Sequence, residues 1–188
     1  MTDHTILIAS LNHYFALATL IGFAVLLIWI VDLLFASFWM PVWKKKMYVI
    51  FENYALPIGF FVSFFATIVS LYYQFYLHIA PCDLCWFQRV FIYPLMFLFG
   101  FAWWKNDRTV YDYVMGLSVF GFVIALYHHY LQLGYNLYKP CSSALFAVDC
   151  AKPTFIEYGF ITYPFMAVVT LALTFLIAYS AKKSATKA

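Results

Sequence analysis

The chain has 188 residues, of which 66% are hydrophobic and only 10% are charged, and its mean hydropathy is +0.85. Soluble domains carry about a quarter charged residues, so this composition excludes a soluble domain and predicts an integral membrane protein. The formal net charge is +3, and the basic residues form no face that would bind phosphates, so we expect no nucleic-acid partner.

Five apolar segments are long enough to cross a hydrocarbon core of about 30 Å, which takes about twenty helical residues. Helices are expected because every backbone polar group must be paired inside lipid, and runs of this length without alternation do not suit a barrel. The predicted fold is therefore an all-α integral membrane protein. The expected spans are residues 14–39, 54–79, 85–104, 111–133 and 160–180.

The first segment is unusual because its apolar character begins near Ile6 and Asp32 lies inside it. It either forms a fifth span or lies partly in the interface, which leaves a four-span core that begins near Tyr54. We expect Asp32 near the inner interface. The predicted organisation is an additional N-terminal transmembrane segment over residues 1–46 and a four-helix antiparallel bundle over residues 47–188.

The lysines and arginines indicate how the chain is oriented. If five spans alternate, eight basic residues fall on one side and only Lys139 and Lys152 on the other. The positive-inside rule then places the C-terminus in the cytoplasm and the N-terminus outside. No charged region of a cleavable signal peptide precedes the first segment, so we interpret it as a retained span. The eight residues are Lys44, Lys45, Lys46, Lys105, Arg108, Lys182, Lys183 and Lys187.

The third segment begins with the motif Pro81-Cys82-Asp83-Leu84-Cys85-Trp86-Phe87-Gln88-Arg89. Helical positions three or four apart share a face, so Cys82, Cys85 and Arg89 should form one column that runs from the water boundary into lipid. Pro81 suits the first helical position. The helix dipole favours a thiolate at Cys82, and Arg89 favours one at Cys85. An arginine facing hydrocarbon is a candidate functional residue, although it can also reach the interface or pair with a carboxylate.

All four cysteines fall on the outer side in this topology, where disulfides form and persist. Three pairings are possible, and the spacing favours Cys82 with Cys85 and Cys141 with Cys150. Two such pairs can pass electrons by thiol–disulfide exchange. Two structural staples are an alternative, although a bridge between Cys82 and Cys85 would constrain little of the unfolded chain. A second alternative is a zinc site made of all four cysteines, although Cys141 and Cys150 are too widely spaced for a zinc knuckle. We therefore predict no metal.

The order of these parts resembles the DsbB-type disulfide bond formation proteins. The matching parts are the nine-residue cysteine motif, His128 with Leu131-Gln132, the stretch from Pro140-Cys141 to Cys150, and residues 158–165. The resemblance covers about residues 54–180 and is to the short-loop, Gram-positive-like members, with the N-terminal span as an addition. Vitamin K epoxide reductase-like proteins share the four-helix plan but place the loop pair before the membrane pair.

The resemblance implies a thiol oxidase of the bacterial inner membrane whose redox cysteines face the periplasm or the extracellular space. Its partner would be a DsbA-like thioredoxin-fold oxidase, and its electron acceptor a membrane quinone, either ubiquinone or menaquinone. Cys141 would receive the partner's attack, Cys150 would attack Cys82, and Cys85 would meet the quinone. Arg89 would hold the Cys85 thiolate and polarise a quinone oxygen.

Quinone reduction also takes up two protons, and histidine is the side chain best suited to exchange protons near neutral pH. His78, His128 and His129 lie near the outer ends of the second and fourth segments. The resemblance implies that His128 lies near the quinone pocket, whereas His78 and His129 are expected to be interfacial residues.

Three other functions stay open at this stage. One is a disulfide reductase with the same topology, and a second is an enzyme of the vitamin K epoxide reductase-like type. The third is a disulfide-stapled membrane scaffold or a transporter. Apart from Arg89 and Asp32 the spans hold few ionisable groups, and no inverted repeat is apparent, which argues against transport.

Overall fold

The computed structural model describes residues 2–39, 41–135 and 149–185, and the side chains of residues 8–32, 53–135 and 149–184. Within these residues the secondary structure is helical, apart from one isolated bridge between Glu157 and Ile161. This confirms the predicted all-α class. The helices are α1 (Thr2–Trp39), α2 (Pro41–Phe75), α3 (Asp83–Lys105), α4 (Val110–Gln132) and α5 (Tyr163–Ala185).

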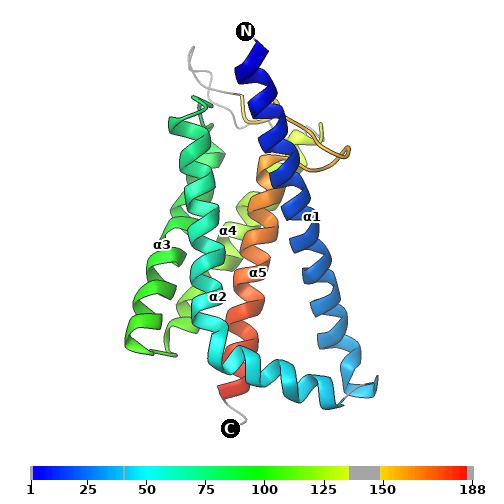
Figure 1. Cartoon of the computed structure of the whole chain (residues 1–188), viewed down its shortest axis with the longest axis vertical. Coiled ribbons are helices and arrows are strands. Elements are labelled where there is room, and N and C mark those ends of the chain that lie inside the picture. The colour runs from blue at the N-terminus through cyan, green and yellow to red at the C-terminus, as the bar shows by residue number, and fades with distance from the viewer. Residues whose placement is uncertain (1, 40, 136–148, 186–188) are drawn as a thin grey trace.

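Helices α2 to α5 form an antiparallel four-helix bundle, and α1 stands beside it (Figure 1). Helix α5 packs against both α4 and α2, whereas α1 contacts α5 and, less extensively, α2. The first residues of α2 cross one end of the bundle before the helix turns along it. Pro57 lies inside α2, and a proline kinks a helix about one turn before its own position, which accounts for this turn.

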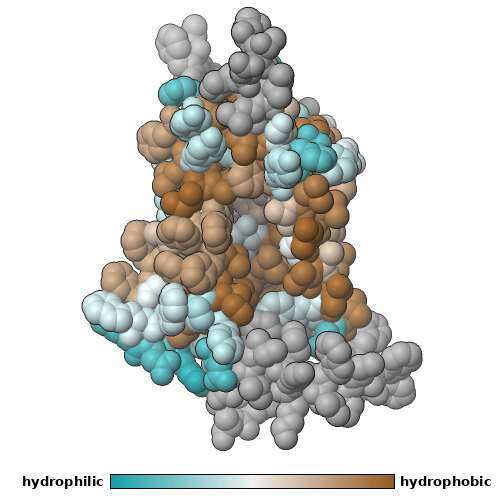
Figure 2. All heavy atoms as spheres, in the orientation of Figure 1, coloured by the Kyte–Doolittle hydropathy of each residue, from teal (hydrophilic) through white to brown (hydrophobic). Residues whose placement is uncertain are grey.

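All five helices are long and apolar enough to span a membrane, so the protein is a multi-pass membrane protein. The spans are Ile8–Asp32, Asn53–Phe75, Asp83–Lys105, Val110–Gln132 and Tyr163–Ser184. Figure 2 shows the corresponding apolar band between two more hydrophilic ends. The most apolar part of the first span is 11% buried within the protein and that of the last is 56% buried, so α5 is the central helix and α1 the most peripheral.

Several helix ends differ from the expected ones. Helix α2 ends at Phe75 instead of residue 79, because the chain then turns through His78, whose φ of 51° is left-handed. Helix α3 starts at Asp83 with Cys82 as its N-cap, so Pro81 precedes the helix and does not open it. The connection between α2 and α3 therefore runs over residues 76–82 and is longer than the predicted short turn. Helix α5 starts at Tyr163 instead of residue 160.

The helices also extend beyond the apolar segments. Helix α1 already begins at Thr2, and α2 includes the three lysines at 44–46. The predicted boundary between residues 46 and 47 thus lies within a helix, and the division into two domains stays a prediction. The side chains of α1 are described only as far as Asp32, so the expected position of Asp32 near the inner interface stays a prediction.

A buried core aligns the bundle helices along their length. Leu95 and Phe99 of α3, Val114 of α4 and Leu171 of α5 are fully buried. Gly121 of α4 allows the close approach of α3 and α5, because a Cβ atom there would lie 2.8 Å from the Cβ of Phe91 and 3.0 Å from Leu171. The packing of α4 against α3 is what brings residues of the two helices together at one end of the bundle.

Candidate active site

The first cysteine pair lies at the start of α3, at the end of the bundle that we call the thiol end. Cys82 is the N-cap, with an extended backbone (φ −78°, ψ 172°), and Cys85 lies in the first turn. Both are thiols, and their Sγ atoms are 3.2 Å apart. The predicted proximity of these two residues is therefore confirmed, and the two sulfurs are close enough for thiol–disulfide chemistry.

The Cys82 thiol holds its proton firmly. It is buried and donates a hydrogen bond to the Cys85 sulfur. This hydrogen bond and burial together raise the pKa of Cys82 to about 12. The expectation that the helix dipole favours a thiolate at Cys82 is therefore wrong for the reduced pair, because desolvation and the bond to Cys85 outweigh the dipole.

A fully buried histidine lies against the first thiol. The Nε2 atom of His128, on α4, is 3.6 Å from Cys82 Sγ. The Nε2 atoms of Gln88 and Gln132 lie 2.9 Å from His128 Nδ1 and 3.3 Å from His128 Nε2, respectively. The side-chain amides of the two glutamines thus contact both ring nitrogens and fix the orientation of the imidazole, and because a neutral ring has only one acceptor nitrogen, only one of the two amides can donate to it at a time. His128 is thus placed to exchange a proton with Cys82.

The two glutamines were not singled out as site residues in the sequence. A signal for them exists, because an amide in a span is rare and costly unless it is hydrogen-bonded. Gln132 lies one helical turn after His128, and Gln88 lies inside the cysteine motif. Their meeting at one histidine depends on how α3 packs against α4, which the sequence pattern does not show.

Arg89 is half-buried and points toward α2. Its guanidinium donates hydrogen bonds to the side-chain oxygen of Gln74 and, at 3.4 Å, to the carbonyl oxygen of Ser70. It also lies 5.1 Å from the centre of the Trp86 ring. These acceptors are an amide and a carbonyl, and they keep the cation within electrostatic reach of Cys85. Of the predicted column of Cys82, Cys85 and Arg89, the last two lie within α3 four residues apart on one helix face, whereas Cys82 precedes the helix as its N-cap.

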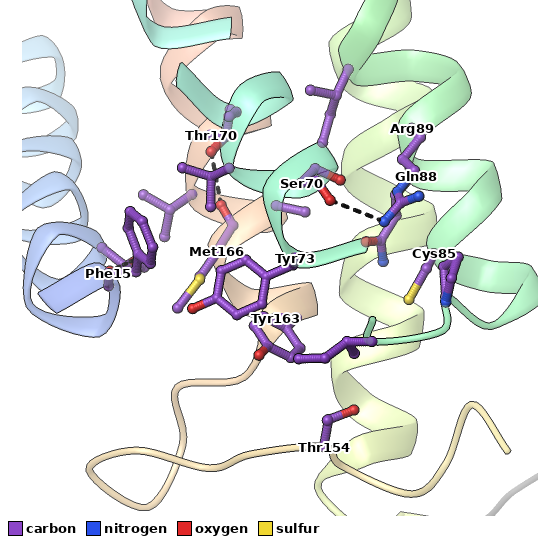
Figure 3. A pocket seen from close by; sticks show the side chains of 18 of the residues that line it. Phe15, Ser70, Tyr73, Cys85, Gln88, Arg89, Thr154, Tyr163, Met166 and Thr170 are labelled. Atoms are coloured by element: carbon purple, nitrogen blue, oxygen red, sulfur yellow. Dashed lines mark hydrogen bonds between the residues drawn. The ribbon is translucent and has the colours of Figure 1, made fainter. Parts of the chain in front are cut away.

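A cavity of about 460 Å³ opens onto these residues. Figure 3 shows Cys85, Gln88 and Arg89 on one side of it, Tyr73 and Tyr163 along it, and Phe15 at the far side. The surface in Figure 2 is hollowed between α2 and α1, inside the apolar band. A concave and mostly apolar site with a few polar groups is typical of small-molecule binding.

The second cysteine pair is described only in part. Cys150 is buried, in the segment before α5, and lies within electrostatic reach of Cys85. The turn that holds it is closed by Asp149, whose carboxylate accepts a hydrogen bond from the Ala151 amide at 3.0 Å. Cys141 lies outside the described residues, so its predicted pairing with Cys150 stays a prediction. The structure nevertheless brings Cys150 to the thiol end.

The three atoms Cys82 Sγ, Cys85 Sγ and a ring nitrogen of His128 lie within 4.8 Å of one another. Thiolate and imidazole are the ligands that zinc prefers, so this group has the composition of an incomplete zinc site. Because Cys141 is not described, the four-cysteine alternative is not tested here, and the predicted absence of a metal stays a prediction.

His78 and His129, which were also predicted near the outer ends of the spans, differ in their exposure. His78 is exposed, in agreement with the expected interfacial position. His129 is buried because the end of α4 packs against the start of α5, and its expected interfacial position stays a prediction. Its Nδ1 atom is 3.0 Å from Thr162 Oγ1, and its ring packs against Phe165. His129 therefore joins two helices.

Comparison with known proteins adds to this geometry. The family model described as "Disulfide bond formation protein DsbB" matches residues 52–181. The chain belongs to the DsbB family. The matched region of this DsbB protein holds all four cysteines, Arg89 and His128, whereas α1 lies outside it. This membership, together with the helices, shows a disulfide-forming membrane protein.

Curated relatives have corresponding descriptions. A "Probable disulfide formation protein" of Coxiella burnetii (strain CbuK_Q154) is 37% identical over 129 residues, which cover 67% of this chain and 86% of the relative. The "SPbeta prophage-derived disulfide bond formation protein B" of Bacillus subtilis (strain 168) is 40% identical over 116 residues, covering 62% and 77%. The "Disulfide bond formation protein C" of the same strain is 35% identical, covering 60% and 80%. No solved structure matches this DsbB protein.

Proposed function

We propose that this DsbB protein oxidises an extracytoplasmic dithiol protein and passes the electrons to a membrane quinone. The partner is a DsbA-like protein of the thioredoxin fold, and the quinone is ubiquinone or menaquinone. The observation that carries the proposal is the position of the Cys82 and Cys85 pair. The pair opens onto an apolar cavity beside the Arg89 guanidinium, and Cys150 lies within electrostatic reach of Cys85.

The residues around the cavity fit a quinone. A volume of about 460 Å³ is within the range of ligand pockets, its walls are mainly apolar, and Arg89 and Cys85 stand at one side. A bound quinone would accept two electrons and two protons. Arg89 would hold the Cys85 thiolate and donate a hydrogen bond to the ligand's oxygen, while its own orientation is kept by Gln74 and Ser70.

The electrons reach Cys82 and Cys85 by exchange steps that each form one disulfide and break another. The partner's first thiolate attacks Cys141, which breaks the Cys141–Cys150 bond and releases Cys150. Cys150 attacks Cys82, which breaks the Cys82–Cys85 bond and releases the Cys85 thiolate. The partner's second thiolate then displaces Cys141, which attacks Cys150, restores the loop disulfide and releases Cys82. The partner has become a disulfide, and the Cys82 and Cys85 pair holds its two electrons and two protons.

Re-forming the Cys82–Cys85 bond requires the Cys82 proton to leave. With its pKa at about 12, Cys82 does not lose that proton to water near neutral pH. His128 lies 3.6 Å from the sulfur and is held at both ring nitrogens by Gln88 and Gln132. We assign to it the role of proton acceptor from Cys82.

The proposed location is the bacterial inner membrane, with the cysteines facing the periplasm or the extracellular space and the C-terminus in the cytoplasm. The positions of the basic residues support this orientation. Lys182, near the end of α5, contacts Asp112 at the start of α4 at 2.5 Å, and Lys105 ends α3. This lysine-bearing end is opposite the thiol end, as the positive-inside rule requires.

The test is to mix purified protein with a reduced thioredoxin-fold oxidase and a soluble quinone analogue, and to follow quinone absorbance. The wild type should consume quinone, Cys85→Ser should abolish turnover, and Arg89→Ala should weaken it. If no dithiol protein supports quinone consumption, the proposed function is rejected.

The order of the two cysteine pairs has its own test. We expect Cys141→Ser to block oxidation of the partner while quinone still oxidises the Cys82 and Cys85 pair, followed by thiol counting. Equal loss of both activities would contradict the assigned order. Electron flow in the opposite direction, from a quinol to a partner disulfide, is tested in the same mixture by starting from quinol and oxidised partner.

A metal site is the second candidate, favoured by the close approach of Cys82, Cys85 and His128. Metal analysis of protein purified without chelators distinguishes the two. One zinc ion per chain that is lost in His128→Ala would support the metal site, whereas metal-free protein that turns over quinone would support the oxidase.

A further inference from the structure

Helix α1 forms part of the cavity wall although it lies outside the matched family region. Phe15, Ala18, Thr19 and Gly22 all line the cavity. Their spacing of three, four and seven residues places them on one face of the helix. The additional helix is therefore part of the proposed quinone site as well as a membrane span.

Specific contacts fix α1 in this position. Buried Asn12 accepts hydrogen bonds through its side-chain oxygen from the Tyr73 hydroxyl at 2.6 Å and from the Tyr163 hydroxyl at 3.2 Å. Fully buried Ala16 packs against α5, and at Gly22 an added Cβ would lie 3.3 Å from Val169. Small residues and interhelical hydrogen bonds are the means by which helices associate in lipid. The wall is thus held against both α2 and α5.

The face that α1 turns to the cavity is apolar. Its one hydroxyl, on Thr19, donates a hydrogen bond to the Phe15 carbonyl oxygen at 2.8 Å and so is already paired within the helix. Figure 3 shows Phe15 across the cavity from Cys85 and Arg89, with Tyr73 and Met166 between them. The polar, redox-active side and the α1 side therefore suit different parts of one amphiphilic ligand.

We propose that this face of α1 binds the isoprenoid side chain of the quinone while Cys85 and Arg89 face its ring. The inference rests on the proposed function and extends it, because it assigns to the additional helix a subsite for the tail. A hydrocarbon tail needs no hydrogen-bond partner, and apolar side chains stabilise it by excluding water. Residues of α1 would then determine which quinone side chains bind, and residues of α3 would determine which quinone rings bind.

The test compares two substitutions of the same kind on α1. Ala18→Leu adds three carbons to the cavity wall, whereas Ala24→Leu adds them on an exposed position that does not line the cavity. Equilibrium binding is measured with decylubiquinone and menaquinone-4 and with their tail-less parents, 2,3-dimethoxy-5-methylbenzoquinone and menadione. We expect Ala18→Leu to raise the Kd of the tailed quinones about tenfold and to leave the tail-less ones within about twofold. Ala24→Leu should resemble the wild type for all four.

A second readout places the tail directly. A quinone with a photoreactive group at the end of its side chain should label peptides of α1 that contain residues 15–22, and Ala18→Leu should reduce this labelling. Single-turnover exchange with the reduced partner in the absence of quinone should be unchanged in both variants, which shows that they are folded.

The outcomes separate this inference from the proposed function. Quinone consumption by the wild type, combined with equal binding by Ala18→Leu and Ala24→Leu or with labelling confined to α3 and α4, overturns the tail subsite alone. Equal weakening of tailed and tail-less quinones by Ala18→Leu also overturns it. If the wild type neither binds nor consumes any quinone, the proposed function fails as well.

Discussion

The chemistry of the site depends on how two neighbouring thiols differ. Cys82 caps a helix and donates a hydrogen bond, while Cys85 lies inside the helix and accepts it. The predicted thiolate at Cys82 was wrong for this reason. A helix N-terminus stabilises a thiolate only if burial and the neighbouring groups do not favour the protonated form more strongly. One thiol therefore stores the proton and the other faces the cation.

The titration of Cys82 can be measured in the reduced protein. Its raised pKa means that it stays protonated from about pH 9, where a free thiol ionises, up to about pH 12. Any stability that this proton contributes is therefore fully present below pH 9 and is lost as the pH rises toward 12. Alkylation of Cys82 followed by mass spectrometry should show a midpoint near pH 12.

In Cys85→Ala the hydrogen-bond partner is lost, so the midpoint for Cys82 should move to lower pH. The midpoints of the two proteins are compared instead of the absolute alkylation rates, because the burial of Cys82 slows alkylation at every pH. Equal midpoints in the two proteins would show that Cys85 does not hold the Cys82 proton.

The adjacent histidines offer a matched pair of variants. His128→Ala removes the proposed proton acceptor, and we expect a loss of about 10² in the rate of Cys82–Cys85 reoxidation, together with a flattened pH profile. His129→Ala removes a contact to Thr162 and should lower thermal stability without changing the shape of that profile. Stopped-flow measurements over pH 5–9 check this. A pH profile altered equally by both substitutions would deny His128 its particular role.

At the scale of elements, α4 matters because it carries His128 to α3. The approach depends on Gly121, where a Cβ would come within 2.8 Å of the Phe91 Cβ atom. That atom is fixed to the backbone of α3, so the helices would have to separate. Nothing lies within 4 Å of a Cβ built at Gly116 on the same helix.

We therefore expect Gly121→Ala to destabilise the protein by about 1–3 kcal/mol, the usual cost of overpacking. Gly116→Ala should be neutral or stabilise it by up to about 1 kcal/mol, because alanine has the better helix propensity. Thermal unfolding in detergent measures both, and quinone turnover should fall only in Gly121→Ala. Equal thermal stability and equal quinone turnover in the two variants would show that neither depends on the close approach of α4 to α3.

At the scale of the whole molecule, the topology has a direct test. A fluorescent protein fused to the C-terminus should fold in the cytoplasm, and an alkaline phosphatase fused after residue 133 should be active outside it. Swapped signals would reverse the sidedness and place the cysteines away from any extracytoplasmic partner.

Part of this architecture could be predicted from the sequence. Long apolar runs define the spans because lipid leaves few alternatives, and the spacing of Cys85 and Arg89 defines a helix face. Helix ends were less predictable, as at Pro81 and at the start of α1, because hydropathy follows lipid contact and not backbone hydrogen bonding. The amides around His128 and the position of α1 at the cavity required tertiary packing, which no local pattern encodes.

The N-cap position of Cys82 has one more consequence. Its sulfur is attached to the last residue of a non-helical connection, residues 76–82, whereas that of Cys85 is attached to the rigid body of α3. We expect the first sulfur to be able to change position by rotation within this connection without unwinding the helix, whereas the second can move only with α3. The two sulfurs of the pair would then differ in mobility although only two residues separate them.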